Sequence, residues 1–241
     1  MSLLVQFLLR LTFGLAAGMA LCSPRDVTSG YFRNHLYVTL GLSLFAGLVA
    51  WSVGGPWQWA FTAAAASYVG AASWLYENRR FGRPMLCVVA ALALAGALQA
   101  AGSDVMLGVA TVTSGLVLGL TMAAMLLGHW YLNTPTMQLE PLRRLLGAMA
   151  GSVVLQMAVS AWGVATLVST GDQPQVSWWL LLVLRWLFGL FGVMGLIIMA
   201  WKTLQIPNTQ SATGILYVAV IGVFAGELLG LLLSADVGVA L

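Results

Sequence analysis

Three ionisable residues lie inside long apolar stretches of this sequence, where charged side chains are rare. Arg10 and Arg185 each stand seven residues from the start of such a stretch, and Glu227 stands six residues from the end of another. At about 1.5 Å per residue, each would lie roughly 10 Å below one surface of a bilayer. An unpaired charge at that depth costs about 3 kcal/mol on insertion scales. We therefore expect Glu227 to pair with Arg185, with Arg10 or with both.

Two interpretations of this charge cluster remain open at the level of sequence. In the first, Arg10, Arg185 and Glu227 form a structural clamp between helices, or the arginines extend outward to the bilayer surface. In the second, they line a polar cavity that binds an anion, a proton or a quinone headgroup, since ionisable residues inside membranes often serve function.

Two histidines form a second candidate site. His35 begins one apolar stretch and His129 ends another, so both are expected at the same bilayer surface. Such a pair could contact a quinone carbonyl or relay protons, and it could also ligate a b-type haem axially. Haem ligands normally lie deeper in the membrane, which favours the quinone or proton role. The structural alternative is a pair of interfacial histidines bonded to water or to turn carbonyls.

The composition shows which elements must position these residues. Hydrophobic residues make up 61% of the chain, charged residues make up 7%, and the mean hydropathy is +0.94. We expect one all-α integral membrane domain over residues 1–241, because a helix needs about 20 apolar residues to cross a bilayer. The eight predicted spans are 3–21, 36–53, 57–76, 85–101, 105–132, 145–169, 178–200 and 212–233.

The charges outside the spans predict the orientation. Eight basic residues fall in the odd-numbered connections, namely Arg25, Arg33, Arg79, Arg80, Arg83, Arg143, Arg144 and Lys202. The even-numbered connections and the C-terminal stretch hold only Asp104, Asp172 and Asp236. By the positive-inside rule the basic connections are cytoplasmic, so both termini lie outside, most simply at a bacterial inner membrane.

Sequence motifs exclude several classes of chemistry from our expectations. No CxxC, CxxCH, HExxH or P-loop pattern occurs, so we expect no metal site and no nucleotide site. The net charge of +3 reflects the cytoplasmic connections and does not indicate a nucleic-acid surface. With no catalytic signature, the chain fits a membrane subunit better than a stand-alone enzyme.

Two patterns concern packing. Residues 10–21 and 185–196 share Arg, Phe, Gly, Leu, Met and Leu at identical spacing, which predicts a parallel repeat of the first and last hairpins. Pairs of glycines four residues apart, as at Gly14 and Gly18 or Gly115 and Gly119, predict close helix contacts. For Gln6, Gln99 and Gln156 we expect hydrogen bonds between helices.

The last span, Val223-Phe-Ala-Gly-Glu227-Leu-Leu-Gly230, resembles the closing helix of the membrane anchor subunits of polysulfide and dimethyl-sulfoxide reductases. The resemblance implies eight spans with both termini outside, and electron exchange between membrane quinone and an iron–sulfur partner. It covers about eight residues and the topology.

These observations favour a non-catalytic membrane subunit of a respiratory redox complex that binds quinone or quinol and contacts other subunits. The alternatives are a small ion-coupled transporter, suggested by the repeat and the buried charges, and a structural or assembly subunit of a large membrane complex.

Overall fold

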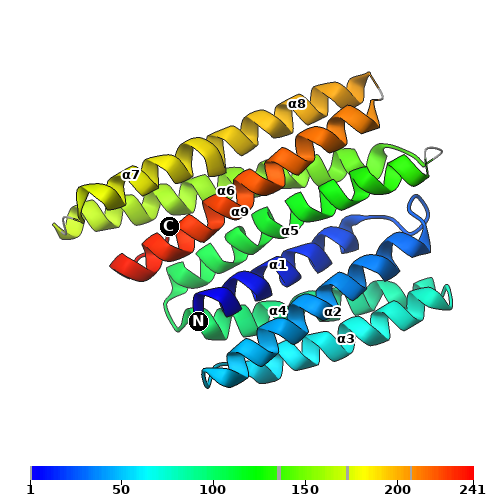
Figure 1. The fold of residues 1–241 in the computed structure, drawn as a ribbon, viewed down its shortest axis with the longest axis horizontal. Helices are drawn as coiled ribbons and strands as arrows, with labels where there is room; N and C mark the ends of the chain where they lie inside the picture. Colours follow the sequence, from blue (N-terminus) through cyan, green and yellow to red (C-terminus); the bar gives the residue numbers. More distant parts are fainter. Residues whose placement is uncertain (1, 135–136, 172–173, 207) are drawn as a thin grey trace.

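The computed structural model describes residues 2–134, 137–171, 174–206 and 208–241, and these are helical with no strand among them (Figure 1). The prediction of an all-α chain is confirmed. The helices are α1 (Ser2–Leu21), α2 (Ser29–Ser52), α3 (Trp57–Leu75), α4 (Arg79–Ala101), α5 (Val105–Asn133), α6 (Glu140–Thr170), α7 (Val176–Leu184), the π-helix η1 (Arg185–Gly192), α8 (Val193–Gln205) and α9 (Thr209–Val237).

Seven helices of the described chain are long and apolar enough to cross a membrane. They are α1, α2, α4, α5, α6, the continuous helix Val176–Gln205 formed by α7, η1 and α8, and α9. Of the eight predicted spans, only α3 is missing from this set. Its sequence is rich in alanine and contains Gln58 and three tryptophans, so its mean hydropathy is lower than that of the other seven although its length is sufficient.

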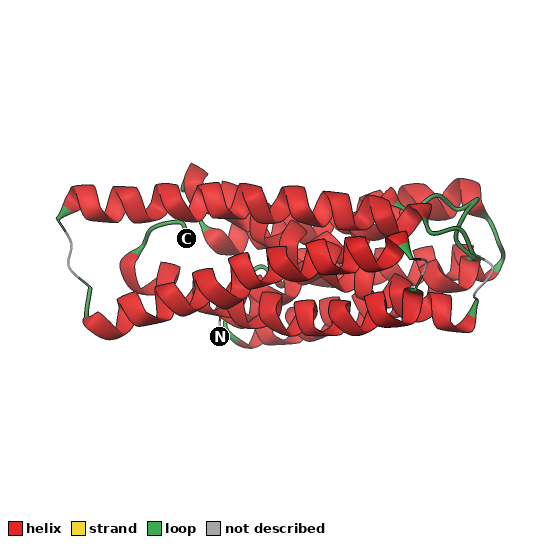
Figure 2. Cartoon of the chain, turned by 90° about the horizontal axis from the view of Figure 1, so that it is seen from above, coloured by secondary structure: helices red, strands yellow, loops and turns green. Residues whose placement is uncertain are grey.

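The helices run alternately up and down along one axis, and their connections gather at the two ends (Figures 1 and 2). Two groups of helices lie side by side. One group is α1–α4, and the other is α5, α6, the α7–α8 helix and α9. The groups meet mainly where α1 packs on α5, so these two helices form the centre of the molecule.

Basic residues gather at one end of this bundle. The connections after α1, α3, α5 and α8 lie together at the right of Figure 1, and the N-terminus and the end of α9 lie toward the other end. The eight basic residues outside the predicted spans belong to these connections or to the adjoining helix turns. Asp104 and Asp236 lie toward the opposite end, whereas Asp172 falls outside the described residues.

Glycines bring α1 and α5 into backbone contact, as predicted. A Cβ atom placed on Gly119 would lie 1.8 Å from the carbonyl carbon of Gly14, and one on Gly18 would lie 2.7 Å from the Cβ of Ala123. Only glycine permits such an approach. In a membrane, where lipid tails are as apolar as leucine, close van der Waals packing of this kind drives helix association.

Candidate functional site

Arg10 lies in the contact between α1 and α5, where its side chain is only 7% exposed. Its Nη2 donates to Thr111 Oγ1 at 2.9 Å and to Gln6 Oε1 at 3.0 Å, and its Nη1 donates to Ser114 Oγ at 3.3 Å. Thr111 and Ser114 are three residues apart on α5, so they face α1 together. The Nε atom of Arg10 is buried without an acceptor in the described chain.

Arg185 is fully buried at the start of η1. Its Nη1 donates to Ser160 Oγ on α6 at 2.8 Å, and its Nε donates to the carbonyl of Gly226 on α9 at 3.2 Å. Its Nη2 lies 3.8 Å from Oε1 of Glu227, which is close enough for an ion pair but too far for a hydrogen bond. Among the described residues this Nη2 has no hydrogen-bond acceptor.

Glycines and a wider helical turn make the space that Arg185 occupies. A Cβ on Gly230 would lie 2.6 Å from Nε of Arg185, so a larger residue there would collide with the guanidinium. Gly189 and Gly226 approach so closely that a Cβ on the first would lie 2.6 Å from the Cα of the second. Gly189 belongs to the π-helix Arg185–Gly192. Such segments are rare inside α-helices and are frequent at functional sites.

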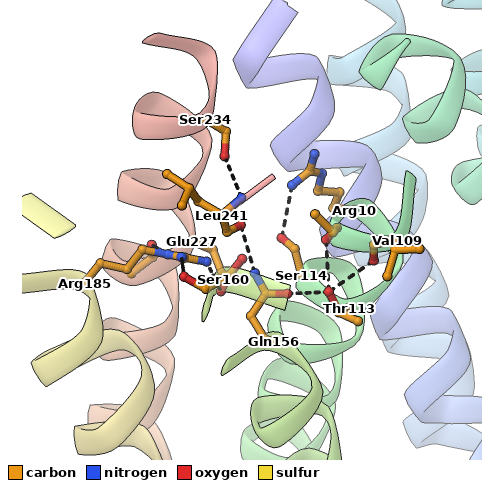
Figure 3. Close-up of polar contacts among 12 residues, drawn as sticks. Arg10, Val109, Thr113, Ser114, Gln156, Ser160, Arg185, Glu227, Ser234 and Leu241 are labelled. Atoms are coloured by element: carbon orange, nitrogen blue, oxygen red, sulfur yellow. Dashed lines mark hydrogen bonds and ion pairs between the residues drawn. The ribbon is translucent and has the colours of Figure 1, made fainter. Parts of the chain in front are cut away.

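A chain of polar groups lies between the two arginines (Figure 3). Gln156 on α6 accepts a hydrogen bond from the Thr113 hydroxyl and donates through Nε2 to the carbonyl of Leu241 at 3.2 Å. We call Arg10, Thr111, Thr113, Ser114, Gln156, Ser160, Arg185 and Glu227 the buried polar network. In an apolar bundle, polar groups of this kind are costly unless they find partners, which explains their convergence.

The segment after α9 folds back and lines the network. Gly238 adopts a left-handed conformation with φ 72°, which turns the chain into the bundle. The N–H of Leu241 then donates to Ser234 Oγ at 3.1 Å, and Ala240 and Leu241 are buried. A Cβ on Gly163 of α6 would lie 1.6 Å from the carbonyl oxygen of Ala240, so this glycine provides room for the segment.

A cavity of about 210 Å³ opens beside Arg10, and we call it the Arg10 cavity. It lies between α1, the start of α5 and the end of α9, toward the end of the bundle that lacks the basic connections. Its lining residues are Leu3, Gln6, Arg10, Ala101, Leu107, Ala110, Leu231, Ser234, Ala235, Gly238 and Leu241. The cavity thus combines an apolar wall with three polar side chains, one of which is a cation.

Glu227 was expected to pair with Arg185, with Arg10 or with both, and it pairs with Arg185, whose Nη2 lies 3.8 Å from its Oε1. Arg10 instead bonds to hydroxyl groups and to Gln6, and it forms no ion pair within 4 Å in the part of the chain that the structure describes. The structure therefore brings all three predicted charges into one region but divides them between two helix contacts.

The two histidines lie elsewhere and differ in environment. His35 is buried, and its Nδ1 lies 2.6 Å from the carbonyl oxygen of Tyr31. His129 is exposed, and its Nδ1 lies 3.2 Å from the hydroxyl of Tyr217. Neither residue lines the Arg10 cavity. The Nδ1 atom of each ring thus has a protein partner.

Several members of the network did not stand out in the sequence. Thr111, Thr113, Ser114 and Ser160 look like ordinary small polar residues of membrane helices, and only the position of the arginines reveals their role. The three glutamines were expected to bond between helices, and this is confirmed for Gln6, which donates to Ala100, and for Gln156, which accepts from Thr113. Gln99 likewise accepts from Trp59 at 2.6 Å.

The arrangement can hold an oxygen-bearing group in an apolar setting. Arg10, Gln6 and Ser234 bring polar atoms to the cavity, and Leu3, Leu107 and Leu231 line it with apolar side chains. No group of three His, Cys, Asp or Glu residues suited to a metal ion occurs within the described residues. Comparisons of the chain with protein-family models, with curated proteins and with solved structures give no match.

Proposed function

We propose that this chain is the quinone- or quinol-binding membrane subunit of a respiratory redox complex, with the quinone headgroup in the Arg10 cavity. The observation that carries the proposal is a buried arginine in the wall of a cavity that polar and apolar side chains line together. Quinone carbonyls are acceptors, and the donors of Arg10 and Gln6 complement them. The resemblance of residues 223–230 to anchor subunits of this class supports the same assignment.

The size of the cavity suits a headgroup. Its volume of about 210 Å³ equals roughly seven waters at about 30 Å³ each, and it is below the range of about 300–1,000 Å³ usual for whole drug-sized ligands. An isoprenoid tail would therefore have to leave the cavity between helices.

Proton exchange is the second requirement. A bound quinone accepts electrons from a redox partner and takes up protons to become the quinol. Glu227 lies one helical turn before Leu231, which lines the cavity, so the two share a face of α9. Among the described residues its carboxylate accepts no hydrogen bond, and its one ion pair is long. We propose Glu227, which is paired with Arg185, as the group that exchanges the proton.

We further propose eight spans with both termini on the outer side of a bacterial inner membrane, with α3 as the eighth. The support is the gathering of basic residues at one end of the bundle. In this orientation the Arg10 cavity lies toward the outer surface. The parallel repeat of the first and last hairpins would place Arg10 and Arg185 in related positions, at α1 and at the start of η1.

Equilibrium binding of a short-chain quinone to the purified protein tests the proposal. Gln6→Leu removes polar atoms from the cavity wall at similar size, and we expect the Kd to rise about two- to tenfold, the value of one or two neutral hydrogen bonds. Gln99→Leu on α4 is the matched control and should bind as wild type, because Gln99 does not line the cavity. Equal affinity in both variants would contradict the assignment.

A separate experiment tests whether the chain is part of a redox complex. Purification in a mild detergent followed by mass spectrometry should recover iron–sulfur or cytochrome polypeptides together with this chain. Recovery of partners that carry no redox centre would instead indicate an assembly subunit.

A small ion-coupled transporter is the second candidate, and the π-helix favours it. Interruption of regular hydrogen bonding at the membrane-buried Arg185 is the kind of local irregularity that transporters use for substrate sites. Reconstituted vesicles that accumulate solute without any partner would support this candidate, and tight vesicles without flux would exclude it.

A further inference from the structure

The charges of the buried polar network do not balance. Arg10 and Arg185 each carry a positive charge, and Glu227 is the one acidic side chain of the network. Arg185 pairs with Glu227, and Arg10 lies at the other end of the network (Figure 3). Of the acidic side chains that the structure describes, none comes within 4 Å of Arg10. One positive charge inside the bundle therefore lacks a paired acidic side chain.

The side chains that bond to Arg10 are neutral. Gln6, Thr111 and Ser114 accept hydrogen bonds from its two Nη atoms, and its Nε has no acceptor among the described residues. Neutral acceptors satisfy N–H groups but do not cancel the charge. A buried charge that no opposite charge compensates is strongly unfavourable, because the interior has a low dielectric constant.

The acidic residues at the same end of the bundle are poor counter-charges for Arg10. Asp104 and Asp236 are both exposed, and neither lines the Arg10 cavity. Asp104 already caps α5, where it accepts from the N–H of Leu107 at 2.8 Å. Water and salt screen exposed carboxylates, so these two act only weakly on a buried charge.

The Arg10 cavity gives an anion access to this charge. Arg10 is part of the cavity wall, to which Gln6 adds a polar side chain and Leu3 and Leu231 add apolar ones. A free inorganic anion would leave the apolar part of the wall uncovered. A ring or chain that carries a negative charge at its polar end would contact both parts.

We propose that the Arg10 cavity selects a headgroup with one negative charge. This inference rests on the proposed function and narrows it, because an ionised hydroxyquinone then binds more tightly than a neutral quinone of similar size. The negative charge faces Arg10, and the ring lies along the leucines. A fatty-acid carboxylate offers the same charge on an apolar body, and the experiment separates these two sources.

Equilibrium binding of three probes to the purified protein at neutral pH tests the proposal. The first is a hydroxynaphthoquinone whose hydroxyl is ionised, the second is its neutral methyl ether, and the third is a medium-chain fatty acid. The ionised hydroxyquinone should bind about five- to fiftyfold more tightly than the ether, because hydrogen bonds between charged groups are stronger than those to neutral acceptors.

Two variants of Thr111 form a matched pair that differs in charge. Thr111 Oγ1 accepts from Arg10 Nη2 at 2.9 Å, and Thr111 does not line the cavity. Thr111→Asp places a carboxylate beside the guanidinium, whereas Thr111→Asn has the same shape without the charge. The preference for the ionised hydroxyquinone should be lost in Thr111→Asp relative to Thr111→Asn, because the new carboxylate compensates Arg10 from within the protein.

The possible results separate this inference from the quinone assignment. Equal affinity of wild type for the ionised hydroxyquinone and its ether would overturn the inference and leave the quinone assignment standing. Binding of the fatty acid without binding of either quinone would support a site for anions and contradict the quinone assignment. An equal preference in the two Thr111 variants would overturn the role of the Arg10 charge in selecting the ligand.

Discussion

The contact between α1 and α5 gives the sharpest structural prediction, because it positions Arg10 through backbone atoms that cannot rotate away. We consider Gly119→Ala. The new Cβ would lie 1.8 Å from the carbonyl carbon of Gly14 and 2.0 Å from the backbone nitrogen of Leu15. An ordinary contact needs at least 3.4 Å, so the helices must separate locally by about 3.4 − 1.8 = 1.6 Å.

This separation has two energetic consequences. Overpacking of a tight core costs about 1–3 kcal/mol. A shift of that size would also lengthen the 2.9 Å bond from Arg10 to Thr111 and the 3.3 Å bond to Ser114 beyond hydrogen-bond range. Each hydrogen bond of a charged donor contributes about 1.5–3 kcal/mol. We therefore expect Gly119→Ala to destabilise the protein by about 3 kcal/mol or more.

Gly147→Ala is the matched control. Gly147 lies on the exposed side of α6, and a Cβ there meets nothing within 4 Å. Alanine should therefore stabilise the helix by about 0.5–1 kcal/mol. Unfolding of the two variants in the same detergent, followed by circular dichroism against denaturant, compares them directly. A Gly119→Ala protein as stable as wild type would refute the close approach of α1 and α5.

Three further predictions follow from the buried groups. Glu227→Gln removes the carboxylate that pairs with Arg185, so it should lower both the yield of the protein and the rate of quinol turnover. A lower yield with unchanged specific activity would show that Glu227 has only a structural role. Gly230→Ala should displace the Arg185 guanidinium and lower the stability of the protein by about 1–3 kcal/mol. Gly214→Ala is the control, because a Cβ there meets nothing within 4 Å and stability should not fall. Equal unfolding midpoints for the two variants would contradict this packing. Burial raises the pKa of the thiol of Cys22, which follows α1, to about 12, so about one thiol in 10,000 is ionised at pH 8. Alkylation followed by mass spectrometry should therefore find Cys22 unmodified at pH 8. The thiol should react only in strongly alkaline or denaturing conditions.

The sequence predicted the helical bundle well, because long apolar stretches admit few other structures in a membrane. The sequence analysis did not predict how much the spans differ in hydropathy. The alanine-rich α3 differs in hydropathy from its neighbours. Several helices also begin before the predicted spans, as α4 does at Arg79, since charged residues at a membrane surface remain compatible with helix.

The sequence predicted the charged residues of the site but not the residues that form hydrogen bonds with them. Arg10, Arg185 and Glu227 stood out because ionisable groups are rare in apolar stretches. Which hydroxyl groups would meet Arg10 depends on the rotation of α5 relative to α1, and no local pattern encodes that angle. The π-helix at Arg185 and the return of residues 238–241 into the bundle arise from tertiary packing, so sequence periodicity could not reveal them.

Photoaffinity labelling with an azidoquinone tests the central claim most directly. The purified protein would be irradiated with the probe, digested and mapped by mass spectrometry. Our account predicts labelling of peptides that line the Arg10 cavity, from the first turns of α1 and the last turns of α9, and competition by unlabelled quinone. Labelling confined to peptides around His35 and His129, or labelling that excess quinone does not reduce, would contradict it.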